Sequence, residues 1–66
     1  MKAKDFVISH YPDAECRALY LGTYTGFCQA IYLDSTKIID IFNDYFGMPK
    51  RTEFQAWSYA KKLIIQ

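Results

Sequence analysis

The sequence contains few residues that could do catalytic or metal chemistry. His10 is the only histidine, and Cys16 and Cys28 are the only thiols. No CxxC or HxxxH spacing brings two such ligands together, as a zinc site requires. Ser9, His10 and Asp13 include the residue types of a hydrolase triad, but close neighbours in sequence cannot supply its geometry. We therefore expect no enzyme, no metal ion and no cofactor, and we place His10 at the end of a helix.

The second group of chemically useful residues is cationic. Lys50 and Arg51 directly precede a helix expected to start at Thr52, and Lys61 and Lys62 follow within that helix. Cations beside a helix N-terminus can bind phosphate. One hypothesis is therefore a small nucleic-acid-binding module that uses Lys50, Arg51, Lys61 and Lys62. The net charge of +1 and the pI near 7.7 favour neither a strong nucleic-acid binder nor an acidic nucleic-acid mimic.

The middle of the chain, Glu15–Phe42, predicts three short strands. Leu21 and Phe27 flank a five-residue connection with glycine at each end, which is typical of a β-hairpin. We expect Leu21 to pair with Phe27, and Leu33 to pair with Ile38 across a second polar turn. Side chains alternate between the faces of a strand, so this register places every charge on one face.

The predicted sheet therefore has a charge-free face and a mixed face. The charge-free face holds Cys16, Ala18, Tyr20, Cys28, Ala30, Tyr32, Ile39 and Ile41. The mixed face holds Glu15, Arg17, Leu19, Leu21, Phe27, Gln29, Ile31, Leu33, Ile38, Asp40 and Phe42. In this register Cys16 and Cys28 share a face but lie roughly 13 Å apart, too far for a disulfide, so we expect two small buried apolar residues.

The segment Ser35–Phe46 has a second interpretation, because its apolar residues also recur at helical spacing. Gly47 would follow the end of such a helix. Isoleucine, phenylalanine and tyrosine favour the strand, whereas asparagine and aspartate do not. A helix here would make residues 35–65 a helix-turn-helix unit that offers Gln55, Ser58 and Lys62 to a nucleic-acid groove. We keep the strand as the first prediction and the helix as its alternative.

Two flanking helices complete the prediction. Ala3, Phe6, Val7, His10 and Tyr11 have the spacing of an amphipathic helix, which a following proline closes near His10. Thr52 and Gln55 form a capping-box arrangement at the start of the second helix. In that helix we expect Trp57 to anchor the core, with Ala56 and Ala60 allowing close approach to the sheet.

These elements predict one small α+β domain over residues 1–66. Its order is α-β-β-β-α, a three-stranded antiparallel meander with both helices on the charge-free face. The alternative is α-β-β-α-α, with 35–46 helical. The first order is also that of the double-stranded RNA-binding domain, although Glu53 and Phe54 stand where that domain places lysines.

Two short helices cover one face of such a sheet, so the mixed face would remain open. Because 52% of the residues are hydrophobic, a monomer of this length can hide them only in part. A large exposed apolar face usually marks an interface, with a second copy as a homodimer or with another protein. The expected partner-binding residues are Arg17, Leu19, Tyr24, Phe27, Gln29, Ile31, Asp40 and Phe42, with Tyr24 exposed at the hairpin tip.

The start of the chain predicts the compartment. Met1 to Asp5 lead into no apolar segment, so we expect no signal peptide. No apolar run approaches the length needed to cross a membrane. We therefore expect a soluble protein in the cytoplasm of its host cell, without a membrane partner.

Two segments resemble small phage and prophage proteins of unknown function. The first is Ala3–Val7 running into Tyr11-Pro12-Asp13-Ala14, a helix followed by a turn, and the second is Thr52–Ala60, with the pattern Thr-x-x-x-Ala-Trp-x-x-Ala. The resemblance covers about a third of the chain and implies a β-meander between the two helices. It also implies a phage setting, in which small proteins often bind a host or defence protein. On this basis we expect an inhibitor that acts by steric occlusion, for example of anti-CRISPR type.

Overall fold

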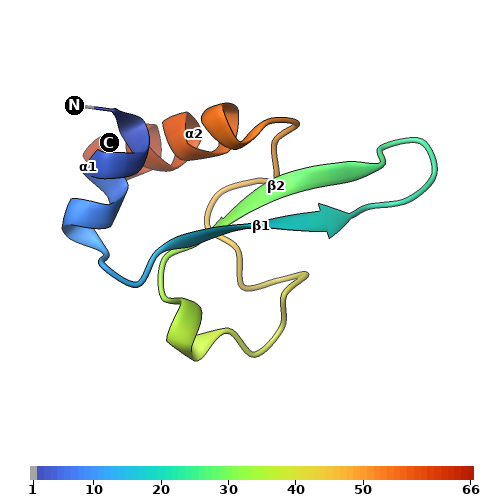
Figure 1. Cartoon of the computed structure of the whole chain (residues 1–66), viewed down its shortest axis with the longest axis horizontal. Helices are drawn as coiled ribbons and strands as arrows, with labels where there is room; N and C mark the ends of the chain where they lie inside the picture. Colours follow the sequence, from blue (N-terminus) through green and yellow to red (C-terminus); the bar gives the residue numbers. More distant parts are fainter. Residues whose placement is uncertain (1) are drawn as a thin grey trace.

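The computed structural model of this chain describes residues 2–66 and has an α+β fold (Figure 1). Helix α1 (Ala3–His10) precedes two antiparallel strands, β1 (Glu15–Tyr20) and β2 (Phe27–Tyr32). A short 3-10 helix, η1 (Ser35–Lys37), follows β2, and α2 (Glu53–Ile65) closes the described chain. The predicted α+β class and both predicted helices are confirmed.

The hairpin register differs by one residue from the prediction. Tyr20 pairs with Phe27, where we expected Leu21 in that position. The cause lies in the turn, in which the Leu21 N–H donates to the Gly26 carbonyl and so extends the ladder beyond Tyr20. Gly22 and Gly26 have φ values of 113° and 69°, a left-handed region that glycine adopts without strain.

A shift of one residue moves every side chain of a strand to the other face. Residues directly opposite each other share a face, so the predicted membership of the two faces is wrong for β2, whereas both charges of β1, Glu15 and Arg17, still lie on one face. One face, the helix side, carries Cys16, Ala18, Tyr20, Phe27, Gln29 and Ile31. The other, the loop side, carries Glu15, Arg17, Leu19, Cys28, Ala30 and Tyr32. The two cysteines are free and lie on opposite faces, so their expected common face is also wrong.

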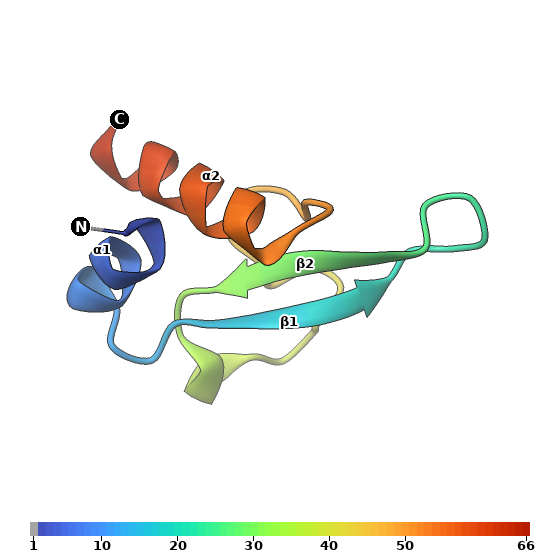
Figure 2. The same cartoon turned by 45° about the horizontal axis from the view of Figure 1, so that its top comes forward.

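The main core lies between the two helices and the helix side of the sheet. Val7 of α1, Ile31 of β2 and Trp57 of α2 are buried together, and Ala56 and Ala60 are buried beside them. Trp57 is therefore the anchor we predicted, and the two alanines bring α2 close to the sheet. Figure 2 shows α1 and α2 on the same side of the hairpin.

A second core lies on the loop side. Leu19, Ala30 and Tyr32 are buried there against Ile38 and Tyr45, which come from the connection between β2 and α2. In Figures 1 and 2 this connection crosses the face of the sheet opposite the two helices. The face that we expected to remain open is therefore covered.

The predicted third strand is absent from the described residues, and so is the alternative helix over 35–46. Carboxylates take the backbone N–H groups that a ladder or a helix would need. Asp34 accepts from the N–H of Thr36 and starts η1. Asp44 accepts from the N–H groups of Ile39 and Asp40, each at 2.7 Å. The result is a series of turns, which removes both the meander and the helix-turn-helix interpretation.

Candidate functional site

The expected partner-binding residues do not form one surface. Leu19 and Ile31 are each only 2% exposed and lie in different cores, on opposite sides of the sheet. Their expected exposure is wrong, because the register shift directs Ile31 to the helices and the connection covers Leu19. The remaining residues of the set are divided between the hairpin and the loop after η1, as described next.

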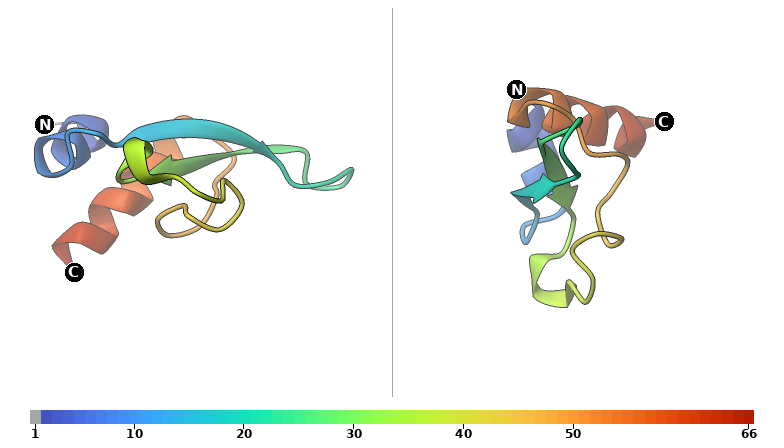
Figure 3. Two further views of the ribbon diagram at one scale, coloured as in Figure 1. Left: turned by 90° about the horizontal axis from the view of Figure 1, so that it is seen from below. Right: turned by 90° about the vertical axis from the view of Figure 1, so that its right-hand side faces the viewer.

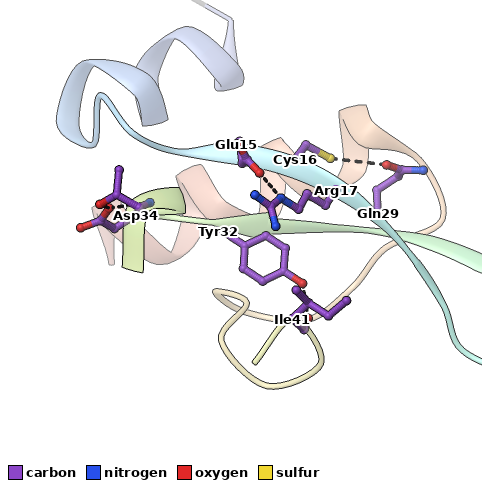
Figure 4. Close-up of polar contacts among 8 residues, drawn as sticks. Glu15, Cys16, Arg17, Gln29, Tyr32, Asp34 and Ile41 are labelled. Atoms are coloured by element: carbon purple, nitrogen blue, oxygen red, sulfur yellow. Dashed lines mark hydrogen bonds and ion pairs between the residues drawn. The ribbon is translucent and has the colours of Figure 1, made fainter. Parts of the chain in front are cut away.

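The sheet contributes two polar residues of the set. Arg17 is exposed on the loop side, where its Nε pairs with Glu15 and its Cζ lies 5.8 Å from the centre of the Tyr32 ring (Figure 4). Gln29 is half-buried on the helix side and accepts a hydrogen bond from the Cys16 thiol. These contacts tie both side chains to their own sheet.

The far end of the hairpin is the most exposed apolar surface of the sheet. We name it the aromatic arm and define it as Tyr20, Leu21, Tyr24 and Phe27. Tyr24 is fully exposed and Phe27 is 67% exposed. The Tyr20 and Phe27 rings pack edge to face with their centres 5.2 Å apart. Figure 1 shows the arm extending beyond the helices, so no other element shields it. The exposure predicted for Tyr24 is confirmed.

A second exposed apolar group lies in the turns after η1. We name Ile39, Ile41 and Phe42 the apical loop; Ile39 is 94% exposed. The Tyr32 hydroxyl donates a hydrogen bond to the Ile41 carbonyl, and Figure 4 shows the ring pointing toward it. Asp40 accepts from the Phe42 N–H and from the Asn43 side chain, and these two hydrogen bonds, the Asn43 one foremost, lower its pKa.

A groove of about 610 Å³ runs along one face of α2. We name it the α2 groove; its lining residues are Lys50, Phe54, Gln55, Ser58, Tyr59, Lys62, Leu63 and Gln66. The Lys50 ammonium lies 4.1 Å from the centre of the Tyr59 ring, a cation–π contact. Among the described residues that line the groove, Lys50 and Lys62 alone have charged side chains, and both are cationic, so the groove favours an anion.

Two of the four cations expected to bind nucleic acid, Lys50 and Lys62, line the groove. Arg51 is exposed outside it, and the Lys61 ammonium instead lies 5.4 Å from the centre of the Phe6 ring. Lys50 belongs to the groove because its backbone exchanges two hydrogen bonds with Gln29, at 2.6 and 2.9 Å. Phe54 and Tyr59 were not predicted as binding residues, although their helical spacing with Ser58 and Lys62 places them on one side of α2.

The half-buried Cys16 thiol is not activated as a nucleophile. Burial raises the pKa of the Cys16 thiol to about 11, with Glu53 adding to the rise and Lys4 opposing it. A thiol with such a pKa is protonated at neutral pH and is a weak nucleophile. Residues 2–66 contain no group of three histidine, cysteine, aspartate or glutamate side chains placed to hold a metal ion.

Comparison with protein-family models, curated proteins and solved structures finds no match to this chain. Of the helices in residues 2–66, none has the length and apolar character needed to cross a membrane. Three exposed features of the molecule can contact a partner: the aromatic arm, the apical loop and the α2 groove.

Proposed function

We propose that this chain is a non-enzymatic protein-interaction module that blocks a larger protein with its aromatic arm. In the phage setting that the resemblance implies, the target is a host or defence protein, as for an inhibitor of anti-CRISPR type. The observation that carries the proposal is the exposure of Tyr24 and Phe27 on an arm that extends beyond the rest of the molecule.

The composition of the arm supports this use. Large aromatic side chains dominate binding energy in protein interfaces, because they bury much area at a low cost in conformational entropy. The Phe27 ring already packs against the Tyr20 ring, and within the turn the Gly26 N–H donates to the Gly22 carbonyl at 2.7 Å. An arm ordered in this way loses little further freedom on binding.

The test is affinity purification of the tagged protein from host lysate, with and without nuclease, followed by identification of retained proteins. We expect a stoichiometric protein partner that survives nuclease. The double variant Tyr24→Ser with Phe27→Ser should weaken its binding by about 30-fold, as loss of an interface hot spot does. The matched control is Ile39→Ser with Phe42→Ser, which removes similar apolar area from the apical loop and should retain the partner.

Two results would contradict this proposal. One is retention of the same partner at full strength by the arm variant. The other is absence of any protein partner together with nucleic acid that nuclease removes. The arm residues are exposed, so the variant should keep the far-ultraviolet circular dichroism spectrum of the wild type, which excludes unfolding as the cause of lost binding.

A second candidate function is binding of single-stranded nucleic acid in the α2 groove. The specific observation is that Lys50 and Lys62 line one groove beside exposed Phe54. Phosphate groups pair with lysine, and bases stack on aromatic rings without sequence preference. This candidate replaces the double-stranded RNA-binding and helix-turn-helix hypotheses, which needed a third strand or a helix over 35–46.

The matched test of this second candidate exchanges charges within and outside the groove. Lys50→Glu with Lys62→Glu should abolish binding of a fluorescent oligonucleotide. Arg51→Glu with Lys61→Glu changes the net charge by the same amount and should leave most of the affinity. The wild-type affinity should fall with salt, since each phosphate that a lysine neutralises adds about 0.7 to the slope of log affinity against log salt concentration for a single strand. Equal losses of oligonucleotide affinity in the two double variants would contradict binding in the α2 groove.

A further inference from the structure

The two edges of the hairpin differ in their backbone hydrogen bonds. On the outer edge of β2, Gln29 exchanges two bonds with Lys50, and the Ile31 carbonyl accepts from the Phe46 N–H at 2.7 Å. The backbone groups of Gln29 and Ile31 therefore point away from β1. The connection between β2 and α2 satisfies this edge.

The outer edge of β1 is unpaired. In an antiparallel ladder, two residues that face each other both point their N–H and C=O groups either inward or outward. Cys16 and Ala18 face Ile31 and Gln29, so their backbone groups point away from β2, and alternation gives Tyr20 the same orientation. Across residues 2–66, no backbone hydrogen bond outside the ladder involves Cys16, Ala18 or Tyr20. In the left view of Figure 3, β1 forms the upper edge of the molecule with no segment above it.

Natural proteins usually protect such an edge, because it can pair with any extended chain. Lysine, proline, bulges and very short strands are the common devices. β1 is six residues long and contains neither a proline nor a lysine. Its two charged residues, Glu15 and Arg17, form an ion pair with each other on the loop side. The residues whose backbone groups point outward, Cys16, Ala18 and Tyr20, carry no charge. The net charge of +1 opposes self-association only weakly.

We propose that a second copy of this chain occupies this edge, so that two hairpins form one four-stranded antiparallel sheet with the order β2-β1-β1-β2. This inference does not rest on the function proposed above, although Tyr20 belongs both to the aromatic arm and to the paired edge. A two-fold axis between the β1 strands makes the interface self-complementary and closed, which leaves no further edge of β1 for growth.

The backbone geometry restricts the register of this pairing. Residues whose backbone groups point outward must face each other, which any axis through a residue of β1 allows. The axes at Arg17 and Ala18 are the two nearest the centre of β1 and pair the greatest length of the strand. An axis at Arg17 would place two arginines directly opposite each other, and like charges so placed are destabilising. An axis at Ala18 sets Ala18 against Ala18 and Tyr20 against Cys16 of the second copy. This register makes six backbone hydrogen bonds, two for each of the three facing pairs.

The same register explains an exposed side chain. Tyr20 lies on the helix side but beyond the reach of its own helices, and it is exposed. The helices pack over the end of β1 that contains Cys16. Pairing Tyr20 with Cys16 of the second copy therefore places the Tyr20 ring beside the helix layer of that copy. The tips of the two aromatic arms point in opposite directions, so Tyr24 remains exposed.

The decisive variant is Ala18→Pro, measured by analytical ultracentrifugation over a range of concentrations. Proline is tolerated on strand edges and here removes only an outward N–H, so the β1–β2 ladder keeps its bonds. We expect the wild type to reach twice its chain mass of 7.7 kDa and the variant to associate at least about tenfold more weakly. Ala18→Thr keeps the N–H and suits a strand, so it should associate like the wild type.

A second variant and a second measurement guard against misfolding of the proline variant. Ala18→Lys places two ammonium groups beside the axis, so it should be monomeric at low salt and recover association at high salt. In the wild type, amide exchange at Ala18 and Tyr20 should slow as concentration rises, while exchange at Arg17, which bonds to β2, should not change. A wild type that is monomeric at about 1 mM, or a dimer retained by both Ala18→Pro and Ala18→Lys, would overturn the proposal. Growth into larger oligomers would overturn the closed two-fold pairing.

Discussion

The two faces of the hairpin are covered in different ways. On the helix side, Ile31 is buried under Val7 and Trp57, which lie on helices whose backbone groups bond within each helix. On the loop side, Leu19 and Tyr32 are buried under turns without regular structure after η1. Apolar burial is therefore the main contribution on the helix side. The loop side also needs acceptors for backbone groups that no regular element satisfies.

Side chains supply those acceptors. Asp44 accepts hydrogen bonds from two backbone N–H groups, and Asp40 accepts one from the Phe42 N–H at 2.9 Å. In the other direction, the Tyr32 hydroxyl donates to the Ile41 carbonyl. A small number of polar groups therefore fixes the turns that pack over Leu19 and Ala30. The comparison indicates that the helix side is stabilised by apolar area and that the loop side responds to hydrogen-bonding and ionisation.

The largest expected effect comes from Trp57→Ala, which removes the anchor of the helix side. Truncation of a buried tryptophan leaves a cavity and typically costs about 3–5 kcal/mol, a large part of the stability of so small a domain. We expect a strongly lowered midpoint, or no cooperative transition, in denaturant unfolding followed by circular dichroism. Phe54→Ala is the control, because Phe54 is exposed on the same helix, and its change should stay within about 0.5 kcal/mol. Similar losses for the two variants would contradict the assignment of Trp57 as anchor.

The elements of the helix side could be predicted because their signals are local. Pro12 ends α1 after His10, and the Thr52 side chain accepts from the Gln55 N–H at the start of α2. Helical spacing then identified Val7 and Trp57 as residues facing a core. Each signal lies within about one turn of the residue it concerns, so no tertiary information was needed.

The register and the loop side could not be predicted in this way. Glycines at both ends of the 22–26 segment indicated a five-residue connection, whereas one bond from Leu21 to Gly26 decides the pairing. Asp40 and Asp44 are compatible with a helix end, a loop or a strand border, so their types did not reveal which N–H groups they accept. These two errors explain why the expected partner-binding residues do not form one surface. Tyr24 was correctly predicted to be exposed, whereas Leu19 is buried.

The next largest effect is expected on the loop side, from Tyr32→Phe. This variant keeps the buried ring and removes only the hydroxyl that donates to Ile41, so it should cost about 1–2 kcal/mol. Amide exchange should accelerate in the apical loop and remain unchanged around Trp57. Tyr24→Phe is the control, since its hydroxyl is on a fully exposed residue. Equal acceleration on both sides of the sheet would contradict a separately held loop side.

Tyr32 also predicts a dependence on alkaline pH. Burial raises the pKa of Tyr32 above its ordinary value of 10.0, with Arg17 opposing the rise. The folded state therefore favours the neutral phenol, and its contribution is present below pH 10.0 and is lost as the pH rises through the raised pKa. In this pH range the amides of the apical loop in the wild type should lose their protection from hydrogen exchange. Tyr32→Phe should show a smaller loss of that protection between the same pH values.

A smaller effect is expected from Thr52→Ala, which tests a polar contact on the helix side. Loss of an N-cap oxygen costs about 1 kcal/mol, because one N–H at the helix start loses its acceptor. Thermal unfolding should show a lowered midpoint, and Thr52→Ser, which keeps the oxygen, should restore most of it. No difference between the alanine and serine variants would show that this cap contributes nothing to the helix side.

The smallest effect is expected from acid titration of the apical loop. The pKa of Asp40 is lowered below its ordinary value of 3.8 by its bonds from Asn43 and from the Phe42 N–H. The stability that these bonds contribute is therefore present above pH 3.8 and is lost as the pH falls through the lowered pKa. Nuclear magnetic resonance should show the amides of residues 39–44 shifting in this range before the Trp57 indole does.

Asp34 also has a lowered pKa, because its side chain accepts hydrogen bonds from Thr36, so Asp40→Asn and Asp34→Asn must be compared. Only Asp40→Asn should remove the titration of the apical loop, and simultaneous shifts of the loop and of Trp57 would mean that the two sides unfold as one unit.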